Sequence, residues 1–445
     1  MSNLEKPIPD GLTAFDQLYI DQLESFYKEI ETLADTIWPG MKLCPVCIYR
    51  QDGPAFLYKH PNPPESLTSI GEELWLGKQA DLQLYAATQF DINGALTAIN
   101  FYDRMGKDCP IECFYAELFH EMHHVYQLNH MSSPRWDDPG LIITYPELVE
   151  NDAIKNYENR ILVELALPEN QQRFQELLNE FYSCRLKRQK IIGDTYLDME
   201  KRVESMEGPA TYCQYKYLES RDRTAWDRAL FKVARHEEFF WLLCQPEHGR
   251  YHLRHRLLMT GLAQCLILSR QEIPDWQQEY FNSNMLLNDY LFSKLPVRQV
   301  PVPDSEELNA KALFFLDQTH KDRKQRFEKF EKQVGFRLNI TFNAIPQCRG
   351  FDPMNAEAID AQTVMHNTTL KLGNVDNSLF FNTGGILTYI VGSVFEITSL
   401  TVFIQDRNQI KNDNGSIMLD SEGKQLNWRG RIVSESKNEI SIELE

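Results

Sequence analysis

The chain has 445 residues, 42% of them hydrophobic and 11% aromatic, which is the composition of a globular protein with room for two or three domains. Its net charge of −18 argues against nucleic acid and anionic membrane surfaces as partners. No apolar run approaches the ~18 residues of a membrane-spanning helix, and the N-terminal residues lack the apolar segment of a signal peptide, so we expect a cytoplasmic protein.

The N-terminal region predicts one helix followed by a mixed β segment. Apolar residues recur at near-helical spacing over residues 13–37, and a Trp-Pro-Gly sequence at 38–40 ends the pattern. Between residues 42 and 102, short apolar runs separated by Gly, Pro and Asn clusters indicate strands. Cys44 and Cys47 form a C-x-x-C in one such strand. Because there is no second pair and the nine cysteines are scattered, we interpret them as free thiols in a reducing compartment.

The run from Asn93 to Tyr102 predicts a strand directly before the next helix. Two interpretations are open. It could be an edge strand that pairs with the backbone of an extended peptide, or an ordinary internal strand.

The predicted helix over residues 111–130 contains the sequence His-Glu-Met-His-His at 120–124. Positions i and i+4 share a helix face, so the imidazoles of His120 and His124 can meet at one point, as two ligands of a tetrahedral zinc ion. Glu121 is placed to take a proton from a zinc-bound water. Apolar and aromatic neighbours predict that the helix is buried, where its polar side chains need partners that a metal supplies. We assign His123 to structure.

Residues 146–293 predict an almost continuous helical region, with breaks at Pro168, Gly193, Pro246 and Pro274. A linker sequence at 300–304 and a charged helix over residues 306–334 follow.

After Gly335 the composition turns to β-forming residues with hairpin turns between them. We therefore expect an α+β fold in four parts. These are an N-terminal helix with a mixed β segment, a helical zinc-binding catalytic domain, a linker with a charged helix, and a small antiparallel β-sandwich or barrel. The expected boundaries are 1–105, 106–295, 296–334 and 335–445.

A catalytic zinc needs a third protein ligand, and His130 is one candidate. With it, the stretch from His120 resembles the H-E-x-x-H-x-x-G-x-x-H motif of the metzincin peptidases, except that Gln127 takes the place of the glycine. That glycine lets the chain turn sharply out of the helix, which a β-carbon disfavours. If the helix simply continues, His130 faces away from the metal.

The other candidate is Glu207. The segment around it, Glu-Gly-Pro-Ala-Thr-Tyr at 207–212, resembles the Asn-Glu-Gly-x-Ala-x-Tyr signature of the gluzincin peptidases, in which the glutamate before the glycine binds zinc from a second helix. Gly208, Ala210 and Tyr212 match the small and aromatic positions. The resemblance implies a mainly helical, zincin-like peptidase core in which Glu207 is the third ligand.

The spacing departs from the gluzincin pattern, because Glu207 lies 83 positions beyond His124, where the family has a short connection. An inserted helical pair at about 147–190 would account for the difference. Glu204, one helical turn before Glu207, is a candidate hydrogen-bond acceptor for a ligand histidine.

In gluzincins a Tyr or His from a later helix stabilises the tetrahedral oxyanion. Carried over to this chain, that role falls to Tyr251 or His255, with Arg254 as an alternative. The order and chemistry of these residues are the whole basis for this expectation.

The sequence thus predicts a zinc-dependent metallopeptidase that acts on a peptide or protein substrate, with one Zn²⁺ per chain held by His120, His124 and Glu207 and with Glu121 as general base. The alternatives are a metzincin-like peptidase that uses His130, a catalytically inactive zinc-binding scaffold, and a metal-free helical protein with buried histidines.

Overall fold

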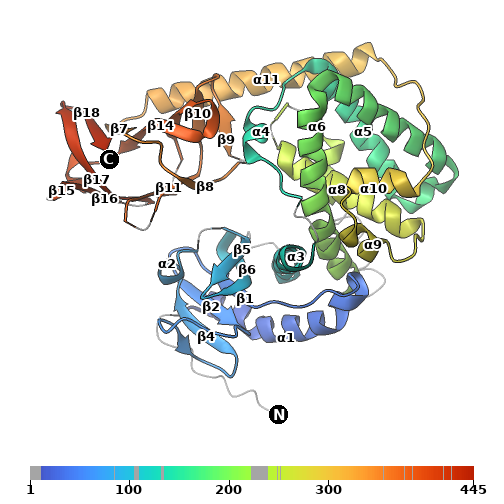
Figure 1. The fold of residues 1–445 in the computed structure, drawn as a ribbon, viewed down its shortest axis with the longest axis horizontal. Coiled ribbons are helices and arrows are strands. Elements are labelled where there is room, and N and C mark those ends of the chain that lie inside the picture. The colour runs from blue at the N-terminus through green and yellow to red at the C-terminus, as the bar shows by residue number, and fades with distance from the viewer. Residues whose placement is uncertain are drawn as a thin grey trace.

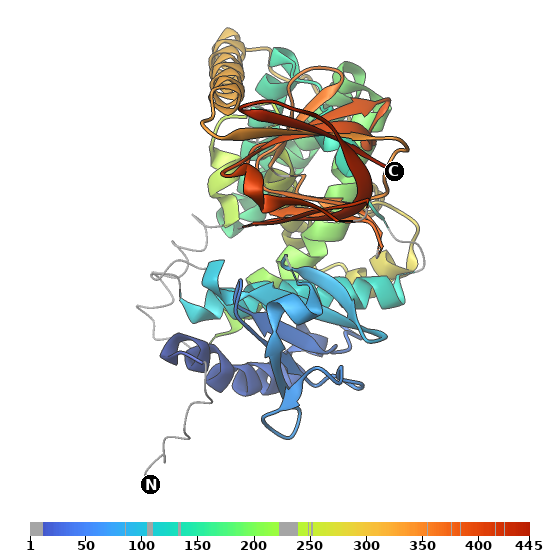
Figure 2. The same ribbon diagram turned by 90° about the vertical axis from the view of Figure 1, so that its left-hand side faces the viewer.

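The computed structural model describes residues 12–84, 86–104, 110–131, 135–221, 239–247, 249–250 and 252–445, apart from positions 354, 375, 383, 414 and 422. It is a mixed α/β structure with an N-terminal sheet, a group of helices and a large C-terminal sheet. The two sheets form separate lobes that both adjoin the helices (Figure 1), and a view at right angles again places one above the other (Figure 2).

The N-terminal lobe is a six-stranded sheet with α1 (Ala14–Ile37) packed against it. Thr13 and Asp16 close a capping box at the start of α1, and the helix ends directly before the Trp-Pro-Gly sequence, as predicted. The sheet order is β3-β4-β2-β1-β6-β5. The elements are β1 (Val46–Tyr49), β2 (Pro54–Tyr58), β3 (Thr68–Ser69), β4 (Leu74–Lys78), α2 (Gln79–Leu82), β5 (Thr88–Ile92), β6 (Ala95–Phe101) and η1 (Tyr102–Arg104).

The strand predicted over residues 93–102 is β6, and it is internal. β6 pairs in parallel with β1 on one side and antiparallel with β5 on the other. The edge-strand interpretation is therefore wrong for this segment, and β5 is the strand that forms this edge of the sheet.

Side chains of the sheet alternate between two cores, as the pleat requires. Val46 and Ile48 face the core that contains α1 and α3 (Ile111–His130), whereas Cys47 and Tyr49 face a smaller core on the other side. α3 packs on β6 and on α6, so it lies between the sheet and the helices, where Figure 1 shows it almost end-on.

The helical group follows the predicted region closely. It contains α4 (Pro139–Ile143), α5 (Val149–Ala166), η2 (Pro168–Arg173), α6 (Phe174–Ser220), α8 (Leu253–Arg270), α9 (Trp276–Asn282) and α10 (Leu287–Lys294). Gly193 is a kink inside α6, with φ 81° and ψ 166°, so the predicted break there is confirmed. α5 and the part of α6 before this kink form a helical pair between His124 and Glu207, as the long spacing required.

The charged helix is α11 (Glu306–Glu331), which runs from the helical group to the C-terminal sheet (Figure 1). Two ion-pair sites secure it. Arg323 binds Glu147, next to α5, through its two terminal guanidinium nitrogens, and Arg326 binds Glu357 of the C-terminal sheet. α11 thereby fixes the sheet to the helices.

The C-terminal sheet has the order β8-β11-β12-β17-β18-β7-β14-β13-β10-β9, with β16 and β15 added beside β17. β8 and β9 lie at opposite ends of this order, yet only residues 352–355 join them, so the sheet curls until it is nearly closed. The elements are β7 (Phe336–Phe342), β8 (Cys348–Phe351), β9 (Ala356–Ala358), β10 (Thr363–His366), β11 (Thr369–Gly373), β12 (Ser378–Asn382), β13 (Ile386–Val391), β14 (Ser393–Ile404), η3 (Arg407–Gln409), β15 (Ile410–Asp413), β16 (Ser416–Ser421), β17 (Lys424–Glu435) and β18 (Glu439–Leu444).

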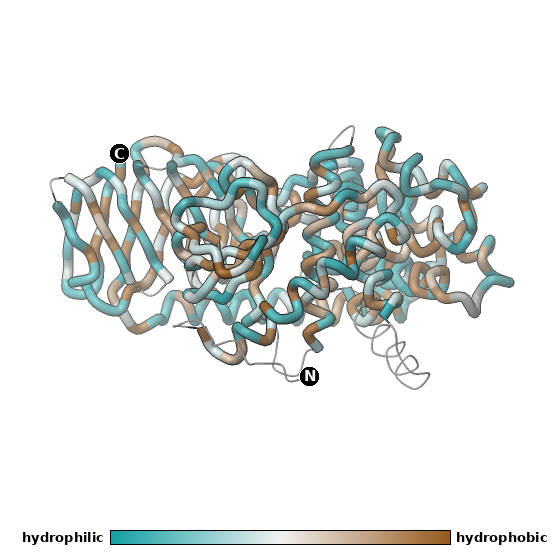
Figure 3. The backbone as a smooth tube through the Cα atoms, turned by 90° about the horizontal axis from the view of Figure 1, so that it is seen from below, coloured by the Kyte–Doolittle hydropathy of each residue, from teal (hydrophilic) through white to brown (hydrophobic). Residues whose placement is uncertain are grey.

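This lobe differs from the expected small antiparallel domain in one respect. β18 pairs in parallel with β7, so the sheet is mixed. The hydropathy pattern of the tube in Figure 3 alternates along these strands, because one face of each lines the interior of the curled sheet. Among the described residues, no helix has the length and apolar character needed to cross a membrane.

Candidate metal centre

Three side chains converge between α3 and α6. The Nε2 atoms of His120 and His124 are 3.0 Å apart, and each lies 3.3 Å from Oε2 of Glu207. Among the described residues, these three form the one cluster of His, Cys, Asp or Glu that could hold a metal ion. Ligands of a tetrahedral zinc ion, bound at about 2.0–2.1 Å, lie about 3.3 Å from one another. The three atoms therefore form one face of a tetrahedron of the size that zinc requires.

The helix period places the two histidines on one face, and one glutamine orients the ring of His124. α3 is uninterrupted from Ile111 to His130, and its period brings His120 and His124 onto one face. Gln127 is fully buried, and its Nε2 donates to the carbonyl of Met206 at 2.8 Å. Its Oε1 must then accept from Nδ1–H of His124, at 2.7 Å, so Nε2 is the nitrogen of His124 that faces the cluster.

The third side chain is placed by a close crossing of α6 and α8. A β-carbon on Gly208 would lie 2.8 Å from Cα of Gly261, so the two backbones touch at this point. The small residue after Glu207 thus allows close contact between α6 and α8. Arg254, at the start of α8, donates to Oε1 of Glu207 at 2.6 Å and lies 3.7 Å from Asp137.

The charges at the centre favour a cation. Burial would raise the pKa of Glu207, but Arg254, His124 and hydrogen bonds from both histidines outweigh it and hold that pKa well below its usual range. Burial would lower the pKa of His124, but the charge and hydrogen bond of Glu207 raise it to about 9. A metal ion at this position would therefore compete with the proton of His124.

Glu121 is half-buried on the adjoining face of α3. Burial raises the pKa of its carboxyl, although the nearby histidines oppose the shift. The shift brings the pKa of this carboxyl closer to neutral pH, and a general base is most effective when its pKa is near the working pH.

A buried ionic network surrounds the part of α6 that carries Glu207. Glu204 accepts hydrogen bonds from Arg185 at 2.5 Å and from Thr260 of α8 at 2.7 Å. Arg188 binds Glu158 of α5 and also pairs with Glu200. All of these side chains are almost completely buried, and the network connects both parts of α6 with α5 and α8. Glu204 is therefore a structural partner of Arg185 and Thr260, and the described residues show no hydrogen bond to it from His120 or His124.

The other candidates lie elsewhere. His130 stacks on Tyr126, and its Nδ1 bonds the Tyr126 carbonyl, so the continuing helix carries it away from the cluster. His255 has His252 as a ring neighbour at 5.8 Å and is outside the cluster, whereas Arg254 is the residue of this segment that binds Glu207. Tyr251 lies outside the described residues.

His123 packs in the core, in line with the structural role expected from the sequence. Its ring packs against Trp38 at 4.6 Å and Phe281 at 5.8 Å, and neither ring nitrogen has a hydrogen-bond partner in the described parts of the chain. Burial lowers its pKa well below the usual range, so the ring stays neutral.

Sequence reasoning missed the roles of Gln127 and Arg254. Gln127 was noticed only as a departure from a glycine, and its spacing of three residues from His124 was the signal for its hydrogen bond.

In comparisons with known proteins, no family model, no curated protein and no solved structure matches this chain.

Proposed function

We propose that this protein is a zinc-dependent metallopeptidase whose metal is held by His120, His124 and Glu207. The supporting observation is the triangle of two imidazole nitrogens and one carboxylate oxygen with edges of 3.0, 3.3 and 3.3 Å. Three ligands of these types leave a fourth position for water, as in hydrolytic zinc sites.

A zinc ion bound there would supply a polarised water and a Lewis acid for the substrate carbonyl. Glu121 takes the proton of the attacking water and passes it to the leaving amine. Gln127 keeps His124 in the tautomer that a metal needs, and Arg254 keeps Glu207 ionised with one oxygen turned to the histidines. Arg254 also carries a positive charge close to Glu121, where it would stabilise a developing oxyanion.

A second candidate is a zinc-binding scaffold without turnover. The observation that favours it is burial, because the three ligand residues are only 7%, 8% and 7% exposed. A closed structural zinc site needs a fourth protein ligand, and no such residue joins the cluster in the described ranges.

Metal analysis tests the centre. Protein purified without added metal should contain close to one zinc per chain. The zinc should be lost from His120→Ala and Glu207→Ala, whereas His130→Ala should retain it as the matched histidine control on α3. A wild type that binds no zinc when zinc is offered would contradict the metal centre, and loss only with His130→Ala would favour the metzincin arrangement.

Turnover of a peptide library separates the two candidates. Glu121→Gln should keep zinc and lose roughly 10²–10⁴-fold in rate, because the amide cannot accept the proton. Undiminished cleavage by Glu121→Gln would refute this mechanism. Stoichiometric zinc with no cleavage by the wild type would favour the scaffold.

A further inference from the structure

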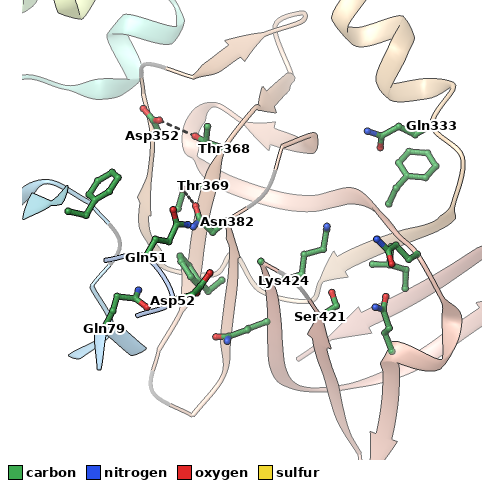
Figure 4. Close-up of a pocket in the computed structure, with 18 of the residues that line it drawn as sticks. Gln51, Asp52, Gln79, Gln333, Asp352, Thr368, Thr369, Asn382, Ser421 and Lys424 are labelled. Atoms are coloured by element: carbon green, nitrogen blue, oxygen red, sulfur yellow. Dashed lines mark hydrogen bonds between the residues drawn. The ribbon is translucent and has the colours of Figure 1, made fainter. Parts of the chain in front are cut away.

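A second concave site lies between the two sheet lobes. Its volume is about 770 Å³, within the ~300–1,000 Å³ that ligand-binding pockets typically have. One wall comes from the N-terminal lobe, with Gln51 and Asp52 in the β1–β2 turn and Gln79 at the start of α2. The other wall comes from β11, β12, β14 and β17 of the C-terminal sheet, and Figure 4 shows side chains of both walls around the same space.

The chemistry of the lining is that of neutral hydrogen bonding. Seven of the twenty lining residues are Gln or Asn and four carry a hydroxyl, whereas small-molecule pockets are usually lined mainly by apolar groups. An amide offers both donors and an acceptor at one end, and a sugar hydroxyl needs both from its partners. The charged members are two carboxylates and Lys424, so neither sign of charge is concentrated here.

Several of these polar groups are already oriented. Thr369 and Asn382 are opposite each other on β11 and β12, and the Thr369 hydroxyl donates to Oδ1 of Asn382 at 2.7 Å. This bond uses the carbonyl oxygen and leaves the amide nitrogen as the donor. Thr368 likewise donates to Asp352 at 3.0 Å, and both bonds appear as dashed lines in Figure 4.

Aromatic rings accompany the amides. Phe101 in the N-terminal wall and Phe380 in the C-terminal wall are both half-buried and line the cleft. A flat apolar ring beside hydrogen-bonding groups matches a sugar, which has an apolar C–H face and a polar rim.

The strands that line the cleft argue against an extended peptide as the ligand. β1, β6, β11, β12, β14 and β17 each pair with a strand on both sides, so their backbone groups are already used. A peptide that adds to a sheet needs a free edge. Recognition here must therefore come from side chains, which suits a ligand with many hydroxyl groups.

We propose that this cleft binds a neutral oligosaccharide, held by amide and hydroxyl side chains from both sheet lobes. This binding site shares no residue with the proposed metal centre and does not depend on it. A ligand in the cleft would contact both lobes at once and hold them together.

The test is a screen of the full-length chain against short neutral oligosaccharides of hexoses and N-acetylhexosamines, followed by calorimetric titration with the sugar that binds. Gln51 and Gln425 are exposed members of opposite walls, so their removal should leave the fold intact. Gln51→Ala and Gln425→Ala should each weaken binding by roughly two- to tenfold, because each loses a hydrogen bond to the ligand.

Gln318→Ala is the matched control, since Gln318 is an exposed glutamine on α11 outside the cleft. It should bind as the wild type does, and so should His120→Ala, whatever its metal content. Unchanged affinity in both cleft variants would overturn the proposal. So would a screen in which the full-length chain binds none of the neutral oligosaccharides.

Discussion

Gln127 does not touch the cluster atoms of His120 or Glu207, yet it decides which nitrogen of His124 faces them. Its amide is fixed at the other end by the carbonyl of Met206, the residue before Glu207. One side chain therefore orients His124 of α3 and ties it to the segment of α6 that carries Glu207.

Replacing Gln127 with Leu should weaken zinc binding by about 10–100-fold, because His124 loses the acceptor that holds its Nδ1–H. The measurement is a competition titration against a chelator of known affinity. Leucine fills similar space in this fully buried position, so a parallel melting curve shows whether the fold survives.

Two outcomes decide this prediction. The tautomer argument holds if the affinity falls while the variant remains folded. An unchanged zinc affinity would show that Gln127 serves only to pack α3 on α6.

The residues that could be predicted were those governed by the helix period. His120 and His124 follow from i, i+4 spacing alone, and Glu207 was found through a short resemblance that named its neighbours. Arg254 could not be singled out in the same way, because several polar residues at the start of α8 look equivalent in the sequence. Only the fold shows which of them reaches Glu207.

At the scale of elements, α6 and α8 cross in close backbone contact. Gly208 and Gly261 face each other without side chains, directly beside Glu207. A change in this crossing would move the segment of α6 that carries Glu207.

Gly261→Ala should destabilise the protein by about 1–3 kcal/mol and lower its zinc content. The new β-carbon would lie 2.7 Å from Cα of Gly208 and 2.8 Å from the carbonyl oxygen of Glu204, which are backbone atoms that cannot turn aside. Denaturant unfolding and metal analysis measure the two effects.

Gly71→Ala is the control, since its β-carbon would meet only Leu74 at 3.4 Å, an ordinary contact. Equal stability of both glycine variants would mean that the helices can separate without cost, and the argument from their close crossing would fail.

Elements were predicted well because their signals are local. Caps, prolines and hydrophobic periods marked α1, α3, α11 and the helical region from residue 146. Strand pairing could not be predicted in this way, because it depends on contacts between segments that are far apart in the sequence. Nothing near Glu439–Leu444 reveals that β18 pairs in parallel with β7, a hundred residues earlier in the chain.

At the scale of the whole molecule, Glu147 joins three parts. It accepts hydrogen bonds from Arg323 of α11 at 3.0 and 2.7 Å and pairs with Arg250, whose guanidinium also donates to the carbonyl of Ala358 in β9. Burial would raise the pKa of Glu147, but the hydrogen bond from Arg323 and the charges of Arg250 and Arg323 lower it to about 2.

Glu147→Gln should lower stability by about 3 kcal/mol near neutral pH, and this loss should shrink in acid. The folded pKa lies below the unfolded value of about 4.3, so the carboxylate stabilises the protein above that pH. The contribution disappears as the pH falls towards about 2. Unfolding of the wild type and the variant at a series of pH values measures the difference.

Glu65→Gln is the control, because Glu65 is exposed. It should change stability little at every pH. A difference between wild type and Glu147→Gln that stays constant between pH 5 and pH 2 would contradict the role given to the Glu147 carboxylate, since most of its contribution should be lost between the unfolded pKa of about 4.3 and the folded pKa of about 2.

The curled C-terminal sheet has a consequence for association between chains. Its end strands, β8 and β9, are four and three residues long, so they offer little unpaired backbone to a strand from another molecule. In the N-terminal sheet the corresponding ends are β3, with two residues, and β5, with five. Among these four end strands, β5 presents the longest row of unpaired backbone groups, and it packs on α3, the helix of the two histidines. An incoming strand would therefore join this protein most readily at β5, and hydrogen exchange of the Thr88–Ile92 amides would report its arrival.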